Sequence, residues 1–348
     1  MKVLVVDDSI VFRSGIRQAI DGQDGIEVVS TAIHGEQALE KVNQMDVDLI
    51  TLDLEMPVLD GISTLKRLRD AGNKTPVIVF SAHSQAGAEK TIEALSAGAQ
   101  DFLAKRVDSD DPDVDSIESI RKILVPKIIQ FHNSIEEIKP VLTPKKPVAT
   151  VKKKINMNSF MPHAICIGSS TGGPEALKKL FTNWKEKPNV PIFIVQHMPP
   201  LFTSHLASML NSVSPFEVVE AAEGMEVLRN VVYLAPGDYH MEIIKNGDGK
   251  FIKLNQNPKV KSVRPAVDVT FLSANDVYAE ILGIVLTGMG EDGLDGARKF
   301  NESSNPIIIQ NEESCIVFGM PGAIFRESLF DFSGDVPEIA NYLNKIVS

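Results

Sequence analysis

Short apolar runs alternate with amphipathic stretches along the first third of the chain. The runs cover residues 2–6, 26–31, 48–52, 76–80 and 100–104. Between them, apolar residues recur at helical spacing over residues 10–20, 35–45, 61–71 and 86–97, and residues 116–130 close the series. Short strands that alternate with helices are typical of βαβ units around a parallel sheet. The pattern predicts a doubly wound α/β domain over residues 1–133.

The apolar pattern is interrupted over residues 134–160, where Lys and Pro cluster. Basic sequence punctuated by Pro is typical of a linker between domains. The alternation returns over residues 161–348, with predicted strands at 164–168, 190–196, 231–235, 280–287 and 305–310 and predicted helices at 174–184, 201–210, 294–302 and 336–347. We therefore expect a second, larger doubly wound domain.

The composition of the chain bears on its number of domains, its partners and its location. The chain has 348 residues, which fits two domains, and a net charge of −11. An acidic chain lacks the basic face that phosphate contacts need, so we expect no nucleic-acid partner. The sequence has no run of 18 apolar residues, so we expect no membrane insertion. Cys166 and Cys315 lie in apolar runs and are interpreted as buried side chains. These features predict a cytoplasmic protein.

Polar side chains follow four of the predicted strands in the first domain. Asp7 and Asp8 follow the first strand, Asp53 the third, Ser81 the fourth and Lys105 the fifth. Because ligands bind beyond the carboxyl ends of parallel strands, we expect these groups to converge. Three carboxylates together favour a hard cation such as Mg²⁺. One carboxylate is then free to attack a phosphoryl group, whose oxygens Ser81 and Lys105 can hold.

The motifs around these residues resemble the receiver domain of response regulators. They are Val5-Val6-Asp7-Asp8-Ser9, Asp53-Leu54-Glu55-Met56-Pro57-Val58-Leu59-Asp60-Gly61, Ser81-Ala82 and Lys105, within about residues 1–130. The resemblance implies a CheY-like fold in which Asp53 accepts a phosphoryl group from a histidine kinase.

The same resemblance implies further roles. Asp8 and Asp53 bind Mg²⁺, and the Glu55 carbonyl and Asp7 assist them. Ser81 and Phe102 form a switch pair, and Lys105 is counted among the switch residues with them.

A glycine-rich turn follows the first predicted strand of the second domain. It is Gly168-Ser169-Ser170-Thr171-Gly172-Gly173, and a predicted helix comes directly after it. Its Gly-x-Ser-x-Gly spacing is that of a nucleophile elbow, which lifts Ser170 above the strand ends. A serine hydroxyl needs a base to become a good nucleophile, and His197 ends the next strand. Because neighbouring strand ends lie within side-chain reach, we expect His197 to be that base.

An acid that orients the imidazole would complete the arrangement. The predicted strand 280–287 runs into Gly288-Met289-Gly290-Glu291-Asp292-Gly293, where either Glu291 or Asp292 can supply the carboxylate. Backbone N–H groups around Met289 can form part of an oxyanion hole. The chain order Ser-His-Asp differs from the Ser-Asp-His order of α/β-hydrolases, so we do not expect an ordinary member of that class.

The same glycine-rich segment allows an alternative interpretation. Gly288-x-Gly290-x-x-Gly293 fits a dinucleotide-binding fingerprint, and Glu312 or Glu313 follows about 20 residues later, where a ribose-binding acid would stand. Against this, Glu291 and Asp292 put two carboxylates where the pyrophosphate would bind. A receiver-regulated dinucleotide-binding oxidoreductase is therefore the less favoured alternative.

Motifs throughout the second domain resemble the chemotaxis protein-glutamate methylesterases, the CheB family. They are Ile167–Gly173, Gln196-His197-Met198-Pro199-Pro200, Pro236–Met241, Arg264-Pro265-Ala266-Val267-Asp268, Leu286–Gly293, Gln310–Cys315 and Phe318-Gly319-Met320-Pro321. The resemblance implies a three-layer αβα domain with Ser170, His197 and Asp292 as catalytic residues and the Met289 N–H near the oxyanion. It selects Asp292 over Glu291.

This second resemblance also implies the reaction. The substrates are glutamate methyl esters of methyl-accepting chemotaxis receptors, hydrolysis releases methanol, and selected receptor glutamines are deamidated. Hydrolysis needs no cofactor, and Mg²⁺ serves the receiver alone. In similar enzymes the unphosphorylated receiver covers the active site, so we expect phosphorylation to activate hydrolysis.

Overall fold

The computed structural model describes residues 1–105, 117–136, 160–187 and 189–346, with only the backbone described for residues 132–136. The chain divides into two compact units, Met1–Val141 and Leu142–Ser348. Residues 137–159 of the predicted linker lie outside the described residues. In the part of the chain that is described, no helix combines the length and apolar character needed to cross a bilayer.

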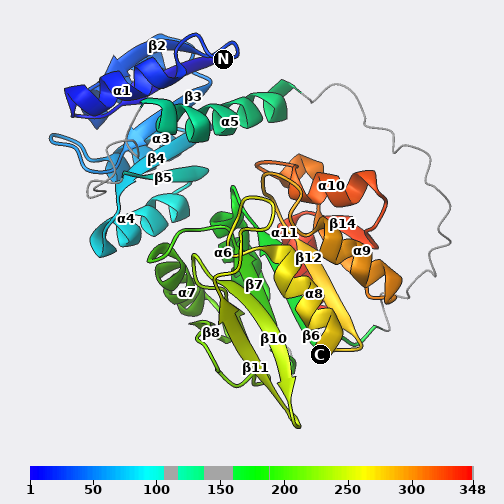
Figure 1. Cartoon of the computed structure of the whole chain (residues 1–348). Coiled ribbons are helices and arrows are strands. Elements are labelled where there is room, and N and C mark those ends of the chain that lie inside the picture. Colours follow the sequence, from blue (N-terminus) through cyan, green and yellow to red (C-terminus); the bar gives the residue numbers. More distant parts are fainter. Residues whose placement is uncertain (106–116, 137–159, 188, 347–348) are drawn as a thin grey trace. The chain divides into compact units, whose positions relative to one another are not determined.

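The first unit is a five-stranded parallel sheet with helices packed around it (Figure 1). Its strands are β1 (Lys2–Val6), β2 (Glu27–Ala32), β3 (Leu49–Asp53), β4 (Val77–Ala82) and β5 (Asp101–Lys105). Its helices are α1 (Ile10–Ile20), α2 (Gly35–Gln44), α3 (Gly61–Asp70), α4 (Gln85–Ser96) and α5 (Ile117–Glu136). Every predicted element of this unit is present, and only α5 extends well beyond its predicted end.

The strand order of the first unit is β2-β1-β3-β4-β5. The chain therefore moves outward from β1 in one direction and then returns to β3 on the other side. Ligands of open α/β sheets bind at such a switch point, beyond the carboxyl ends of the strands. Asp7 follows β1 and Asp53 ends β3, so the acidic residues stand at this point.

The second unit is a larger sheet of seven parallel strands, in the order β14-β13-β12-β6-β7-β9-β8. The strands are β6 (Ala164–Ser169), β7 (Ile192–Gln196), β8 (Glu217–Glu220), β9 (Val231–Leu234), β12 (Ile281–Val285), β13 (Ile307–Gln310) and β14 (Phe332–Gly334). The helices are α6 (Gly173–Asn183), α7 (Phe202–Val213), α8 (Val267–Val277), α9 (Leu294–Glu302), α10 (Met320–Arg326) and α11 (Val336–Ile346), with a short 3₁₀ helix at Glu312–Ser314. This architecture confirms the predicted fold class of two α/β units with parallel sheets.

Helices cover both faces of this second sheet. One layer contains α6, α7 and α11, and the other contains α8, α9 and α10. Gly168 lets α8 approach β6, because a Cβ atom there would lie 2.6 Å from Val267 Cγ1. Phe271 of α8 stacks on Phe300 of α9 with ring centroids 5.1 Å apart. These contacts pack α8 against β6 and against α9.

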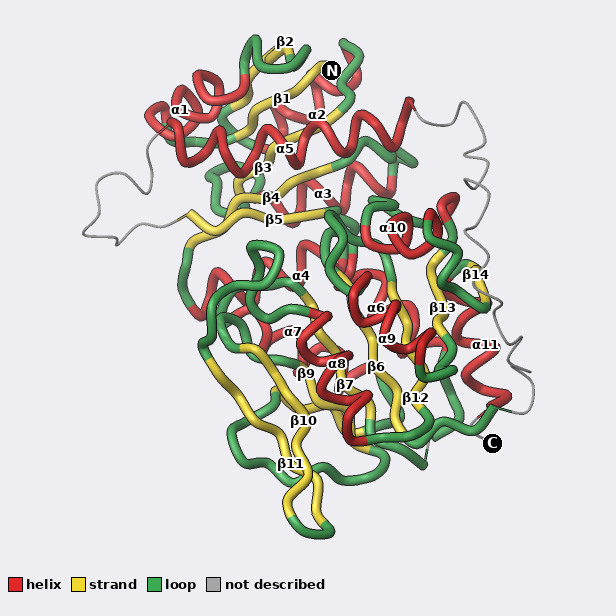
Figure 2. Tube along the Cα trace, turned by 45° about the vertical axis from the view of Figure 1, so that its right-hand side comes forward, coloured by secondary structure: helices red, strands yellow, loops and turns green. Residues whose placement is uncertain are grey.

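Several elements of the second unit are absent from the sequence prediction. They are β8, β14, α8, α10 and an antiparallel hairpin of β10 (His240–Asn246) and β11 (Gly249–Asn255). Figure 2 shows this hairpin extending from the unit. The prediction missed α8 because its apolar and polar residues are mixed around the helix instead of being separated onto two faces. β14 is only three residues long, too short to give a periodic signal.

Candidate functional site

Three strand ends of the second unit lie side by side at the switch point of its sheet. β6 pairs with β12 on one side and with β7 on the other. Ser169, the last residue of β6, pairs in register with Gln196, the last residue of β7, and the His197 N–H donates to the Ser169 carbonyl at 3.1 Å. Ser170 and His197 are therefore the next residues of adjacent strands, and the loop after β12 lies on the other side of Ser170.

Ser170 occupies a tight turn between β6 and α6. Gly172 supplies the left-handed backbone conformation that this turn needs, with φ at +76°. The Ser170 N–H donates to the Thr287 carbonyl at 3.1 Å, and the Ser170 side chain is half-buried. Within the described parts of the chain, the Ser170 hydroxyl makes no hydrogen bond to His197. Catalytic contacts of this kind often tighten only when substrate binds.

The amide of Gln196 connects the two segments that carry Ser170 and His197. It is almost fully buried, its Oε1 accepts a hydrogen bond from the Ser169 hydroxyl at 2.7 Å, and its Nε2 donates to the carbonyls of Ser170 (2.9 Å) and His197 (3.1 Å). One side chain thus fixes the backbone of both candidate catalytic residues. Nothing in the sequence pattern predicted this role for Gln196.

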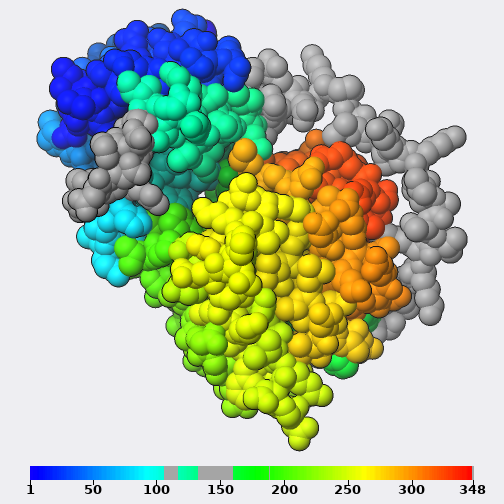
Figure 3. All heavy atoms as spheres, in the orientation of Figure 1, coloured from blue at the N-terminus to red at the C-terminus, as the bar shows by residue number. Residues whose placement is uncertain are grey.

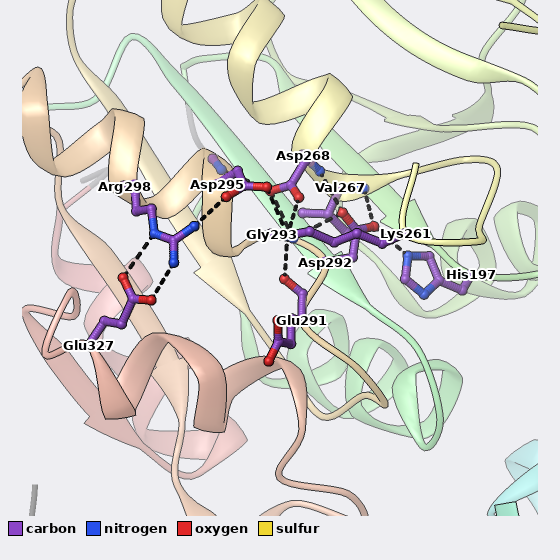
Figure 4. Close-up of polar contacts among 11 residues, drawn as sticks. His197, Lys261, Val267, Asp268, Glu291, Asp292, Gly293, Asp295, Arg298 and Glu327 are labelled. Atoms are coloured by element: carbon purple, nitrogen blue, oxygen red, sulfur yellow. Dashed lines mark hydrogen bonds and ion pairs between the residues drawn. The ribbon is translucent and has the colours of Figure 1, made fainter. Parts of the chain in front are cut away.

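His197 contacts a carboxylate through its Nε2 atom. Nε2 lies 2.7 Å from Oδ2 of Asp292, and both side chains are largely buried. This contact uses one ring nitrogen, so Nδ1 is the nitrogen left to take a proton. Figure 4 shows the imidazole beside Asp292 and the Glu291 side chain directed away from it. Glu291 is exposed and lies 4.0 Å from Arg326. Of the two acids left open by spacing, the structure places Asp292 against the imidazole.

The Asp292 carboxylate is held by backbone donors as well. It accepts hydrogen bonds from the N–H groups of Val267 (2.6 Å), Asp268 (3.0 Å) and Gly293 (3.0 Å). Burial raises the pKa of Asp292, but the hydrogen bond from His197 and these backbone donors outweigh it, so the pKa lies below its ordinary value. Asp292 is therefore ionised at neutral pH and can stabilise an imidazolium.

The loop that carries Met289 is held by backbone hydrogen bonds from the start of α10. The Gly288 carbonyl accepts hydrogen bonds from the N–H groups of Gly319 (3.1 Å) and Met320 (2.8 Å). A Cβ atom on Gly288 would lie 2.8 Å from the Cβ of Ser170. Met289 is half-buried next to this contact, which places its backbone close to Ser170.

The dinucleotide interpretation does not fit the start of α9. The N–H groups of Gly293 and Gly296, which a pyrophosphate would use, already donate to the Asp268 carboxylate at 3.0 and 2.8 Å. The position where a phosphate would bind is therefore filled by a carboxylate of the chain. No spacing or motif in the sequence predicted a role for Asp268 or for its ion-pair partner Lys261.

The acidic residues of the first unit form a second candidate site. One carboxylate oxygen from each of Asp7, Asp8 and Asp53 lies within 4.8 Å of the others. Lys105 Nζ lies 2.7 Å from Asp7 Oδ2 and 2.9 Å from Asp53 Oδ2. Burial raises the pKa of Asp53, while Lys105 opposes the increase. Three carboxylates balanced by one ammonium have the donor set and the excess negative charge that suit Mg²⁺.

The remaining predicted residues of this unit surround Asp53. The Glu55 N–H donates to Asp53 Oδ1 at 3.3 Å, and the Glu55 side chain lies 2.6 Å from Lys90. Ser81 is buried and donates its hydroxyl hydrogen to the Gly87 carbonyl at 2.8 Å. Phe102 is half-buried on β5.

Comparison with known proteins covers both units. The family model of CheB methylesterase matches residues 165–343, and that of the response regulator receiver domain matches residues 3–112. A protein-glutamate methylesterase/protein-glutamine glutaminase of Trichodesmium erythraeum is 40% identical over 332 residues, covering 95% of this chain and 94% of the relative. One of Clostridium acetobutylicum is 39% identical over 349 residues, covering 100% and 98%.

A solved structure also matches the second unit. The CheB methylesterase catalytic domain of Thermotoga maritima is 39% identical, with a TM-score of 0.52, and the match covers 53% of this chain and 99% of that domain. With relatives of this identity along its whole length, a receiver domain at residues 3–112 and the strand-end arrangement of Ser170, His197 and Asp292, the chain belongs to the CheB methylesterase family.

Proposed function

We propose that this chain is a phosphorylation-activated carboxylic-ester hydrolase of bacterial chemotaxis. Its substrates are glutamate methyl esters of methyl-accepting chemotaxis receptors, from which it releases methanol, and selected receptor glutamines, which it deamidates. The observation that carries this proposal is the 2.7 Å contact of His197 Nε2 with Asp292 Oδ2 beside Ser170, in a chain whose relatives are named protein-glutamate methylesterase/protein-glutamine glutaminase.

The proposed mechanism assigns one role to each of three side chains. Ser170 attacks the side-chain carbonyl carbon of the ester, and Nδ1 of His197 takes the hydroxyl proton. His197 then gives this proton to the departing methoxide, which leaves as methanol. Asp292 stabilises the imidazolium between these steps. The Met289 N–H donates to the oxyanion, a contact of a kind that contributes about 2.7–4 kcal/mol.

Water completes the cycle. It hydrolyses the acyl-enzyme with His197 again as general base, which leaves a glutamate carboxylate. A second route, in which Ser170 orients a water molecule that attacks directly, uses the same base and gives the same products. A glutamine side chain presents the same carbonyl and releases ammonia instead of methanol.

The receiver domain supplies regulation in this proposal. Asp53 accepts a phosphoryl group from a chemotaxis histidine kinase, and Lys105 and Ser81 hold the new phosphoryl oxygens, with Phe102 responding to Ser81. Asp7, Asp8 and Asp53, with the Glu55 carbonyl, would hold Mg²⁺, which offsets the negative charge of the incoming phosphoryl group. Hydrolysis at Ser170 uses neither a metal nor an organic cofactor.

Domain boundaries and a cellular location belong to the same proposal. The receiver covers residues 1–133, the linker 134–160 and the catalytic domain 161–348. The protein acts in the cytoplasm, without a nucleic-acid partner and without insertion into a membrane.

Methanol release from methylated receptor membranes tests the proposed function. The full-length protein should release methanol, and acetyl phosphate should increase the rate. A parallel titration with NAD(H) should show no tight binding. Absence of methanol release with and without phosphodonor would contradict the proposal, and tight NAD(H) binding would restore the oxidoreductase alternative.

A further inference from the structure

Two buried carboxylates stand next to each other beneath the imidazole, and the proposed chemistry uses only one of them. Asp292 and Asp268 are each 2% exposed. A buried carboxylate is costly unless hydrogen bonds and an opposite charge compensate it. The second carboxylate therefore needs a physical explanation.

The two carboxylates cap each other's helices. Asp292 accepts the N–H groups of Val267 and Asp268, in the first turn of α8. Asp268 accepts the N–H groups of Gly293 and Gly296, at the start of α9. The N-cap residue of neither helix provides a side-chain cap of its own. Each carboxylate thus holds the segment that carries the other. Figure 3 shows the α8 region in yellow and the α9 region in orange side by side on one face.

Lys261 provides the positive charge for the second carboxylate. Its Nζ lies 2.7 Å from Asp268 Oδ2 and 3.1 Å from Asp295 Oδ2, and it donates to the Glu291 carbonyl at 3.0 Å (Figure 4). Lys261 and Ser262 both have left-handed backbone conformations, with φ at +48° and +69°. Such conformations are strained for residues other than Gly and persist where the surrounding structure enforces them. Here reciprocal backbone hydrogen bonds between Val260 and Val263 close the tight turn that carries Lys261.

The charged groups around Asp268 come from three segments. Lys261 lies in the loop before α8, Asp292 lies in the loop before α9, and Asp295 lies in the first turn of α9, where Arg298 also pairs with it. Burial and the charge of Asp292 raise the pKa of Asp268 to about 6, and Lys261 opposes the increase. His197 contacts Oδ2 of Asp292, whereas the Asp268 N–H donates to Oδ1 of the same carboxylate.

We infer that Asp268 and Lys261 form a positioning pair for the catalytic acid. Asp268 fixes the segment that carries Asp292, and Lys261 balances the second carboxylate, so that His197 faces one net negative charge rather than two. Both residues act through Asp292. The inference deepens the proposed function and rests on it, because it takes Asp292 as the acid that orients the base.

Two substitutions test the pair, one that removes its positive charge and one that removes its negative charge. Wherever Asp268 is ionised, Lys261→Met leaves two uncompensated carboxylates near the imidazole and stabilises its protonated form, so the acid limb of kcat/KM should move to higher pH. Asp268→Asn keeps an oxygen acceptor for Gly293 and Gly296 but removes a negative charge, so the limb should move to lower pH. With an effective dielectric constant of roughly 20 between these charges and the imidazole, we expect each shift of the acid limb to be about half a pH unit or more.

Three further variants make the result specific. The double variant should return the acid limb close to its wild-type position, and Lys261→Arg, which retains the charge, should keep it there. Lys253→Met is the matched control, because Lys253 is an exposed lysine of the hairpin whose ion pair is with Glu242 and not with Asp268. A purely structural pair would lower the rate without moving the limb in opposite directions. Shifts of the same sign, or no shift, would overturn the inference.

A second measurement separates this inference from the proposed function. The full-length protein is labelled with ¹⁵N at histidine, and the His197 signals are assigned as those absent from His197→Gln. Their titration should shift upward in Lys261→Met and downward in Asp268→Asn. Because this readout needs no substrate, an inactive wild-type protein would refute the function alone, and unmoved His197 signals would refute the pair.

Discussion

At the scale of single residues, Gln196 is the side chain on which the geometry of the site depends most. Its amide engages the Ser169 hydroxyl and the carbonyls of Ser170 and His197. Methionine has a similar volume but cannot replace these hydrogen bonds. We expect Gln196→Met to lower kcat by roughly 100-fold through misplacement of the reacting groups. It should also cost about 1–3 kcal/mol of unfolding free energy, because buried polar groups lose partners.

Steady-state kinetics and urea unfolding measure the two effects. Gln44→Met is the control, because Gln44 is exposed on α2 and bonds only to Glu40 among the described residues. A Gln196→Met enzyme with wild-type kcat would show that the amide does not position the catalytic residues.

Asp53 gives a residue-scale prediction about stability and pH. Burial raises its pKa in the folded protein above the unfolded value near 3.8, so the folded state holds the proton more tightly. The stability of the receiver should therefore fall as pH rises from about 4 through this raised pKa. Asp53→Asn removes that loss, so the variant should unfold at a higher temperature at pH 7 and should lose activation by acetyl phosphate. Calorimetry at several pH values measures the difference, and a variant less stable than wild type at pH 7 would contradict it.

Mg²⁺ provides a complementary test of the same carboxylates. A dication between Asp7, Asp8 and Asp53 should stabilise the wild-type receiver and raise its unfolding temperature. The increase should be smaller in Asp53→Asn, which has lost one carboxylate ligand. Equal increases in both proteins would place the bound ion elsewhere.

At the scale of elements, the loop after β12 packs closely against the turn after β6, which carries the proposed nucleophile Ser170. A Cβ atom on Gly288 would lie 2.4 Å from Met320 Sδ and 2.8 Å from the Cβ of Ser170. Gly288→Ala should displace Ser170 and lower kcat by at least about tenfold, with a smaller effect on substrate binding. Gly15→Ala is the matched control, because a Cβ atom there meets nothing within 4 Å, and alanine in α1 should add about 0.5–1 kcal/mol of stability. Unchanged kcat in Gly288→Ala would contradict the contact.

The elements that the sequence predicted share a strong periodic signal. β3 and β6 are fully buried apolar strands, and α9 has a clear apolar face, so their patterns identify them. α8 was missed because its polar and apolar residues are poorly separated around the helix, although it supplies two N–H groups to Asp292. The N–H groups of its first turn find their acceptor, Asp292, only in the folded chain, so the sequence pattern carries no signal of this cap.

The residues of the candidate site also divide into those that the sequence predicted and those that it did not. Glycine turns and strand ends predicted where Ser170 and His197 stand, because neighbouring strands of a parallel sheet carry their ends to one edge. The spacing did not choose between Glu291 and Asp292, since adjacent residues differ only in direction. The pair of Lys261 and Asp268 was not predicted, because Lys261 lies in a loop and its spacing to Asp268 in α8 does not show which way its side chain turns.

At the scale of the whole molecule, the proposed regulation depends on the receiver and the catalytic domain sharing one chain. A tether of about 25 residues gives the receiver a high effective concentration near the catalytic domain. We predict that a truncated chain beginning near Ser159 hydrolyses methyl esters faster than the full-length protein without phosphodonor. Saturating acetyl phosphate should narrow the difference. Equal specific activities without phosphodonor would exclude inhibition by the receiver.

The central claim is that Ser170 is the nucleophile served by His197 and Asp292. The most direct measurement is methanol release from methylated receptor membranes by wild type, Ser170→Ala and Ser208→Ala, in which Ser208 is an exposed serine of α7. Each protein is also assayed for phosphorylation at Asp53. We predict that Ser170→Ala loses at least about 10³-fold in rate while Asp53 phosphorylation and the Ser208→Ala rate stay at wild-type levels. Retention of methanol release by Ser170→Ala would contradict the account.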